Sequence, residues 1–364
     1  MIRQGSTLLA GAAFGLAALA LAGCATDRSE TSATAPDGRR YLSQPLVTEI
    51  YTADPSAHVF NDRIYVYGSH DIETGAPEND MGDHFEMRDY RVFSMDRPGA
   101  PVTVHPVALD VKDVPWAKRQ MWAPDAATKN GRYYLYFPAK DHDDVFRIGV
   151  ATSDRPEGPF RAEPQAIPGS FSMDPAVFTD TDGQSYMLFG GIWGGQLQRW
   201  ANGRYDPNGS KTDLGRDDQP AIAPRVARMS ADMLTFAEPV REIQILDPAG
   251  KPILGGDHDR RFFEASWLHK RGDTYYFSYS TGDTHFIAYA TAKSPYGPFT
   301  YRGRILEPVE GWTSHHSIVE QNGRWYLFYH DTQLSGKTHL RNVKATELVH
   351  EADDTIRTIR PLLP

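Results

Sequence analysis

Five short segments of this chain share one pattern of polar and apolar positions. In each, a polar pair such as Asn-Gly or Asp-Gly precedes a run of aromatic and β-branched residues. Such pairs tolerate positive φ and close hairpins, and the residue types after them favour strands. The pattern therefore predicts five hairpins. They are NDRIYVYGSH (61–70), NGRYYLYFPA (130–139), DGQSYMLFGG (182–191), RGDTYYFSYS (271–280) and NGRWYLFYHD (322–331).

A further β-rich segment follows each hairpin, so each repeat holds at least three strands. The clearest are FRIGVATSDRPEGPF (146–160) and FIAYATAKSPYGPF (286–299). The turn positions 62, 131, 183, 272 and 323 lie 69, 52, 89 and 51 residues apart, which suits four-stranded sheets with unequal loops. Small sheets repeated around an axis form a propeller. We predict an all-β, five-bladed β-propeller in preference to a β-sandwich, which does not need five copies of one hairpin.

Composition and charge narrow the class of partner. The 364 residues are 40% hydrophobic, enough for one large or two small domains. Aromatic residues make up 12%, which favours strands. The formal charge is 38 minus 47, or −9, with the acids spread along the chain. This balance gives no electrostatic support for nucleic-acid binding and suits a neutral substrate.

The first 23 residues have the pattern of an export signal. Arg3 precedes the apolar run LLAGAAFGLAALALAG, which is too short for a membrane span, and Cys24 follows as the only cysteine. LAGC resembles the bacterial lipobox, which implies a lipid on Cys24 and attachment to a bacterial membrane, with Ala25 favouring the outer membrane. A signal peptide cut elsewhere is the alternative. Residues 24–44 read as a flexible tether, and 45–364 as the propeller domain.

Four of the five residues that lie eight or nine positions before the predicted turns are polar: Asp54, Asp174, Glu264 and His315. The fifth is Ala123, beside Trp122. The first strand of every propeller blade lines the central channel, so these residues should meet at one end of it. A single aspartate beside a strand is usually a turn or cap residue. Three carboxylates at equivalent positions are harder to explain in that way.

The surroundings of the three acids predict unlike proton affinities. Asp54 and Asp174 each precede proline, which favours an extended backbone and would fix the direction of the carboxylate. Glu264, in FFEASW, has apolar neighbours that would bury it and raise its pKa. One ionised and one protonated carboxyl form the pair that glycoside hydrolysis requires.

At these residues the chain resembles glycoside hydrolase family 43, five-bladed propellers that remove xylose or arabinose from plant polysaccharides. The motifs ADPSAHVF, QMWAPDA, SFSMDPAVF, RFFEASWLHK and SHHSIV occur in the order of that family, and the similarity begins near Pro45. The resemblance implies that Asp54 is the general base, that Asp174 orients the acid and adjusts its pKa, and that Glu264 is the general acid. It also implies inversion, with Asp54 and Glu264 roughly 6.5 to 9.5 Å apart.

The same resemblance implies further site residues. His315 matches a channel histidine that faces a hydrated calcium ion, although Ser314 replaces the usual glycine and His316 is adjacent. Sodium, chloride or a histidine bonded within the core are the alternatives, because calcium prefers oxygen ligands. Trp122, which matches a pocket residue of the family, and Trp193, which has glycines beside it, are candidate sugar platforms. A place in the core is the alternative for Trp193. Arg341 resembles a pocket arginine that contacts sugar hydroxyls or the acid, the alternative being a surface arginine.

These features favour an exo-acting β-xylosidase that acts on xylo- or arabino-oligosaccharides, with possible α-L-arabinofuranosidase activity. The acidic insert 69–90 is expected to form a solvated loop over the channel mouth, without the spacing of a calcium loop. We expect no C-terminal β-sandwich of the kind that some relatives carry, because the propeller is expected to take up residues 45–364. An endo-arabinanase with an open groove is the second hypothesis, and a glycan-binding propeller without activity is the third.

Overall fold

The structure is a computed structural model that describes Met1, residues 34–201 and residues 203–364. The predicted signal peptide and the lipid-bearing Cys24 lie outside the described residues. Within the described ranges, no helix is long and apolar enough to cross a membrane.

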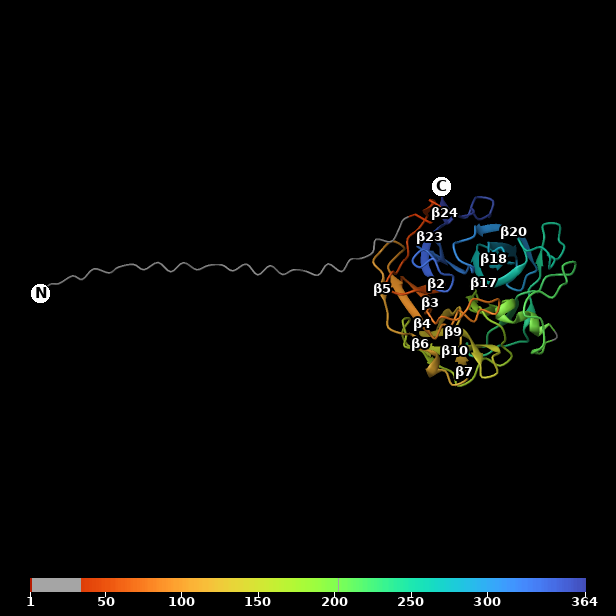
Figure 1. Cartoon of the computed structure of the whole chain (residues 1–364), viewed down its shortest axis with the longest axis horizontal. Coiled ribbons are helices and arrows are strands. Elements are labelled where there is room, and N and C mark those ends of the chain that lie inside the picture. Colours follow the sequence, from red (N-terminus) through yellow and green to blue (C-terminus); the bar gives the residue numbers. More distant parts are fainter. Residues whose placement is uncertain (2–33, 202) are drawn as a thin grey trace. The chain divides into compact units, whose positions relative to one another are not determined.

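Five sheets, antiparallel except for one parallel strand pair in the fourth, follow one another along the chain, and their colours run in order around a ring in Figure 1. This confirms the all-β, five-bladed propeller. The strands are β2 (Thr52–Phe60), β3 (Arg63–His70), β4 (Asp89–Met95), β5 (Thr103–Val104) and β6 (Leu109–Asp110) in blade 1; β7 (Ala117–Arg119), β8 (Asp125–Lys129), β9 (Arg132–Asp141), β10 (Phe146–Ser153) and β11 (Arg161–Ala162) in blade 2; β12 (Ala176–Thr179), β13 (Ser185–Phe189), β14 (Arg225–Arg228) and β15 (Arg241–Glu242) in blade 3; β16 (Ile245–Leu246), β17 (Phe262–Arg271), β18 (Thr274–Thr281), β19 (Ile287–Ala292) and β20 (Phe299–Leu306) in blade 4; and β21 (His316–Gln321), β22 (Arg324–Asp331) and β23 (Asn342–Leu348) in blade 5.

Short 3-10 helices interrupt the blade loops. They are η1 (Val111–Asp113), η2 (Trp193–Gly195) and η3 (Leu197–Trp200). Each predicted hairpin joins two consecutive strands of one blade: β2–β3, β8–β9, β12–β13, β17–β18 and β21–β22. Asn61, Asn130 and Asn322 have φ of 51°, 54° and 53° at three of these turns. Asparagine reaches this left-handed region at little cost, which explains why the polar pairs mark the turns.

Aromatic residues of the strands fill the space between neighbouring blades. Tyr67 and Tyr90 of blade 1 pack in one cluster with Phe137 of blade 2. Tyr276 of blade 4 and Tyr329 of blade 5 share another. A buried aromatic side chain removes about 150–250 Å² from water, so these seams supply much of the burial that holds the blades together.

The ring closes where the start and end of the described domain meet. Strand β1 (Arg40–Tyr41) pairs with β24 (Leu362–Leu363). Ala35 and Tyr41 are buried there against Leu362. The predicted tether boundary at residue 44 is therefore wrong for residues 35–41, because apolar side chains in this segment fold onto the propeller. The rest of the predicted tether up to residue 33 lies outside the described residues.

Candidate active site

One strand from each blade (β2, β8, β12, β17 and β21) begins at a single pocket. Asp54 lies in β2, Asp174 just before β12 and Glu264 in β17. The pocket is lined by these three acids and also by Trp122, Ala123, Trp193, His315 and Arg341. The structure thus brings together every predicted site residue within the described ranges.

The backbone at the acids differs from the prediction. Asp54 and Asp174 have φ of 53° and 54°, and Ala265, next to Glu264, has φ of 61°. The expectation of an extended backbone before proline is wrong at both aspartates. Irregular pairing accompanies this conformation in β2, between Ala53 and Ser56, and on both sides of Glu264 in β17. Bulges of this kind turn a side chain away from the strand direction, here into the pocket.

Asp54 is held as a carboxylate by several donors. Its Oδ2 accepts a hydrogen bond from the Ser69 hydroxyl at 2.7 Å, and its Oδ1 lies 3.0 Å from Nη1 of Arg341. Its backbone N–H donates to Nδ1 of His330 at 3.0 Å. Burial raises the pKa of Asp54, but the charge of Arg341, the neighbouring His330 and His315 rings and the hydrogen bond from Ser69 together outweigh burial and lower that pKa below its usual value.

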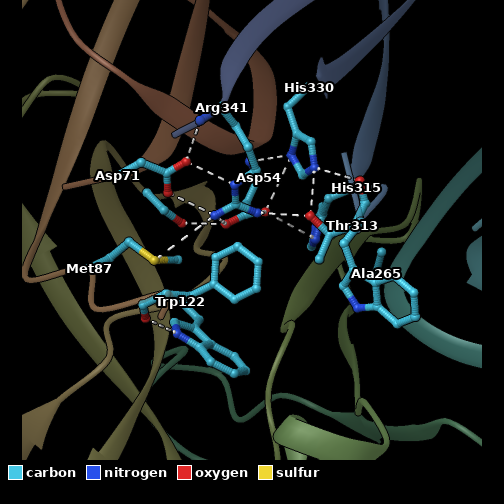
Figure 2. Close-up of polar contacts among 12 residues, drawn as sticks. Asp54, Asp71, Met87, Trp122, Ala265, Thr313, His315, His330 and Arg341 are labelled. Carbon is cyan, nitrogen blue, oxygen red and sulfur yellow. Dashed lines mark hydrogen bonds and ion pairs between the residues drawn. The ribbon is translucent and has the colours of Figure 1, made fainter. Parts of the chain in front are cut away.

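Arg341 lies between two buried aspartates (Figure 2). Its Nη2 and Nε donate to the two oxygens of Asp71 at 2.8 and 2.9 Å. The resemblance implied contact with sugar hydroxyls or the acid, whereas the structure pairs Arg341 with Asp54, the predicted base. Because both aspartates are buried, the guanidinium is fixed in place. Its positive charge stabilises the ionised form of Asp54.

Sequence reasoning missed Asp71 and His330. Asp71 directly follows β3, within SHD (69–71), and His330 lies at the end of β22, within YHD (329–331). The repeated His-Asp pair at equivalent positions of two repeats was the available signal. The partner of Asp71 is Arg341 and that of His330 is Asp54, each more than 250 residues away along the chain, so only the folded chain reveals these contacts.

Asp71→Asn is expected to lower the free energy of unfolding by about 3 kcal/mol, because it leaves a buried guanidinium with one carboxylate instead of two. Chemical denaturation measures this. The matched control is Asp259→Asn, which breaks a surface ion pair with Arg304, 3.0 Å long with side chains 56% and 31% exposed. That change should cost less than about 1 kcal/mol. Equal losses in the two variants would contradict a fixing role for Asp71.

Asp174 and Glu264 form a coupled pair of carboxyls with raised pKa values. Burial raises the pKa of Asp174 to about 8, and burial with the charges of Asp174 and Asp54 raises that of Glu264 well above its usual value. Asp174 accepts a hydrogen bond from the Ala265 N–H at 2.8 Å, which favours its ionised form. Among the described residues none donates to Glu264. The two carboxyls therefore retain a shared proton near neutral pH. This proton lies on Glu264, because the hydrogen bond from Ala265 stabilises the ionised form of Asp174.

His315, and not its neighbour His316, faces the carboxylates. Its Nδ1 lies 3.8 Å from Oδ2 of Asp174 and 4.0 Å from Oδ1 of Asp54. Burial lowers the pKa of His315 to about 4, so the ring is neutral at pH 7. His316 is fully buried and bonds through Nε2 to the Ser278 hydroxyl at 2.6 Å.

The residues around His315 do not fit a directly coordinated calcium ion. Calcium takes six to eight oxygen ligands, and His315 offers one nitrogen beside Asp54, which is already paired with Arg341. Across residues 34–201 and 203–364, no group of three or more His, Cys, Asp and Glu side chains is arranged to hold a metal.

The predicted platforms occupy different parts of the pocket. Trp122 is only 8% exposed; its Nε1 donates to the Phe85 carbonyl, and its ring packs against Phe146. It therefore forms a wall with little open face. Trp193 is partly exposed and lies 6.1 Å from the ring of Trp312, which is 43% exposed and was not predicted.

The insert 69–90 folds over the pocket, as expected, but it is not simply a solvated loop. Asp71, His84, Phe85 and Met87 are buried, and all except Asp71 line the pocket. Phe85 lies under the Arg341 guanidinium, 4.8 Å from ring centre to Cζ. The insert thus closes one side of the site.

A propeller that gathers an ionised and a protonated carboxyl in one pocket has the layout of a glycoside hydrolase. The chain belongs to the glycosyl hydrolases family 43, whose sequence profile matches residues 44–356. The Xylosidase/arabinosidase 43A of Humicola insolens is 59% identical over 325 residues, which cover 87% of this chain and 99% of that protein. The Xylosidase/arabinosidase of Bacteroides ovatus is 55% identical, with coverage of 86% and 96%.

A solved structure agrees with this assignment. CoXyl43, a GH43 beta-xylosidase/alpha-arabinofuranosidase from a compost microbial metagenome, was crystallised with xylotriose in a calcium-free form. It has a TM-score of 0.87 and 68% identity, and the match covers 89% of this chain and 99% of that chain.

Proposed function

We propose that this glycoside hydrolase is an exo-acting, inverting β-1,4-xylosidase that also releases α-L-arabinofuranosyl groups. The observation that carries the proposal is that one pocket holds both Asp54, which is paired with Arg341, and Glu264, whose burial raises its pKa. The names of the relatives and the xylotriose bound to the structural neighbour support xylose and arabinose as the sugars. The insert 69–90 favours a closed pocket over an open groove.

Each carboxyl then has one task. Asp54, ionised beside Arg341, removes a proton from the water that attacks the anomeric carbon. Glu264 donates its proton to the glycosidic oxygen as that bond breaks. Asp174 binds the backbone N–H of Ala265, which fixes the turn that carries Glu264, and its negative charge raises the pKa of the acid. Product release returns the proton from Asp54 to solvent and reloads Glu264.

The products from xylotriose and linear arabinan test this proposal. We expect the protein to release xylose from xylotriose, and NMR should show the α-anomer of xylose first. We expect little cleavage within the arabinan chain. Arabino-oligosaccharides from arabinan would favour the endo-arabinanase instead. Sugar binding without any hydrolysis would favour the non-catalytic propeller.

We also propose that a hydrated calcium ion binds near His315. Its support is the description of the structural neighbour as a calcium-free form. Because the protein ligands do not fit direct coordination, such an ion would bind mainly through water, and no step above depends on it. After chelation, added Ca²⁺ is expected to raise the melting temperature of the wild type but not of His315→Ala. Equal shifts in both proteins would place the ion elsewhere.

Attachment through a lipid on Cys24, to the outer membrane, is proposed from the LAGC motif and Ala25. Incorporation of labelled palmitate that is lost in Cys24→Ala would support it. Label in both proteins, or in neither, would argue against it.

A further inference from the structure

Trp193 is held in a conformation that a tryptophan rarely adopts. Its φ is 55°, in the left-handed region where a bulky side chain is strained. Its carbonyl accepts a hydrogen bond from Nε2 of Gln198 at 3.0 Å. A side-chain carbon at the next residue, Gly194, would lie 2.9 Å from the Met81 carbonyl oxygen, so the insert 69–90 packs closely on this turn. A strained backbone that several contacts hold in place is typical of a functional position.

Asp213 fixes the indole itself. Nε1 of Trp193 donates to Oδ1 of Asp213 at 3.0 Å. Oδ2 of Asp213 accepts from Nη2 of Arg261, also at 3.0 Å. Arg261 is only 6% exposed and lies three residues before Glu264. A charged bond therefore ties the strand that carries the acid to the wall formed by Trp193.

Trp193 lies on the acid side of the pocket. Its ring meets that of Phe263, the residue before Glu264, edge to face at 5.4 Å. Its other neighbour is the exposed Trp312. Because the acid protonates the oxygen of the leaving group, the departing sugar must lie between Glu264 and solvent, along these rings. Arg341 and Asp71, in contrast, surround the base.

We propose that Asp213 is a positioning residue that orients Trp193 toward the leaving-group sugar and so favours oligosaccharides over substrates with small leaving groups. This inference rests on the proposed function. Asp213 does not line the pocket, so it acts on a bound sugar through the residues it holds, the indole of Trp193 and the guanidinium of Arg261. Aromatic faces bind the C–H faces of sugars only when the ring is correctly oriented, so loss of the Nε1 bond should weaken the productive complex selectively.

The test compares xylotriose with β-D-xylosyl fluoride, whose leaving group is a single atom. Asp213→Ala is expected to lower kcat/KM for xylotriose about five- to tenfold, the value of roughly one hydrogen bond, and to change that for the fluoride by less than about twofold. Asp213→Asn should recover most of the loss, because the amide oxygen can still accept from the indole. In a Trp193→Phe background, Asp213→Ala should have little further effect.

The matched control is Asp218→Ala, an exposed aspartate of the same loop, which should behave as the wild type on both substrates. If Asp213→Ala fails to fold, Trp193→Phe alone should reproduce the selective loss. Equal losses on xylotriose and fluoride, or no loss in either variant, would overturn the role of Asp213. A wild-type protein that cleaves neither substrate would overturn the proposed function instead.

Discussion

Glu264→Gln is expected to lower kcat for xylotriose about 10²–10⁴-fold, the usual contribution of a general acid. The loss should be much smaller for 2,4-dinitrophenyl β-xyloside, because that leaving group departs without a proton.

In the wild type, kcat for xylotriose should fall as the pH rises through the raised pKa of Glu264, since the acid form disappears. With the dinitrophenyl substrate this alkaline loss should be absent. Steady-state kinetics from pH 4 to 10 measure both effects.

Glutamine preserves the shape of the side chain, so the variant should melt close to the wild-type temperature. Glu347→Gln, an exposed glutamate on β23, is the matched control and should retain full activity. Equal losses on the two substrates would show that Glu264 does not donate the proton. Asp174 would then be the next candidate, because its pKa is also raised.

The repeating elements could be predicted because their signals are local. Each hairpin turn carries its own Asn, Asp or Gly, and each second strand its own aromatic run, so five copies reinforce one another. The position of Asp54, Asp174 and Glu264 at one end of the ring then follows from propeller geometry alone. The same reasoning placed Trp122 and His315 beside them.

The parts outside the repeat could not be predicted. Asp71, Trp312 and Asp213 lie in loops or at strand ends, and their partners are set only by the folded chain. The left-handed backbone at Asp54 and Asp174 opposes the local preference of a residue before proline. Tertiary contacts, such as the bond from the Asp54 N–H to His330, outweigh that preference.

Asp54→Asn is expected to lower kcat about 10³–10⁴-fold for xylotriose and the dinitrophenyl xyloside alike, because water must be activated whatever the leaving group. This equal loss separates the base from the acid. Azide attacks without losing a proton, so added azide should restore turnover of the dinitrophenyl substrate and give the inverted α-xylosyl azide. In the wild type, the low pKa of Asp54 keeps the base ionised, so activity should fall only below the usual carboxylate range as the pH decreases. A β-xylosyl azide product, or a loss confined to xylotriose, would contradict direct inversion by water at Asp54.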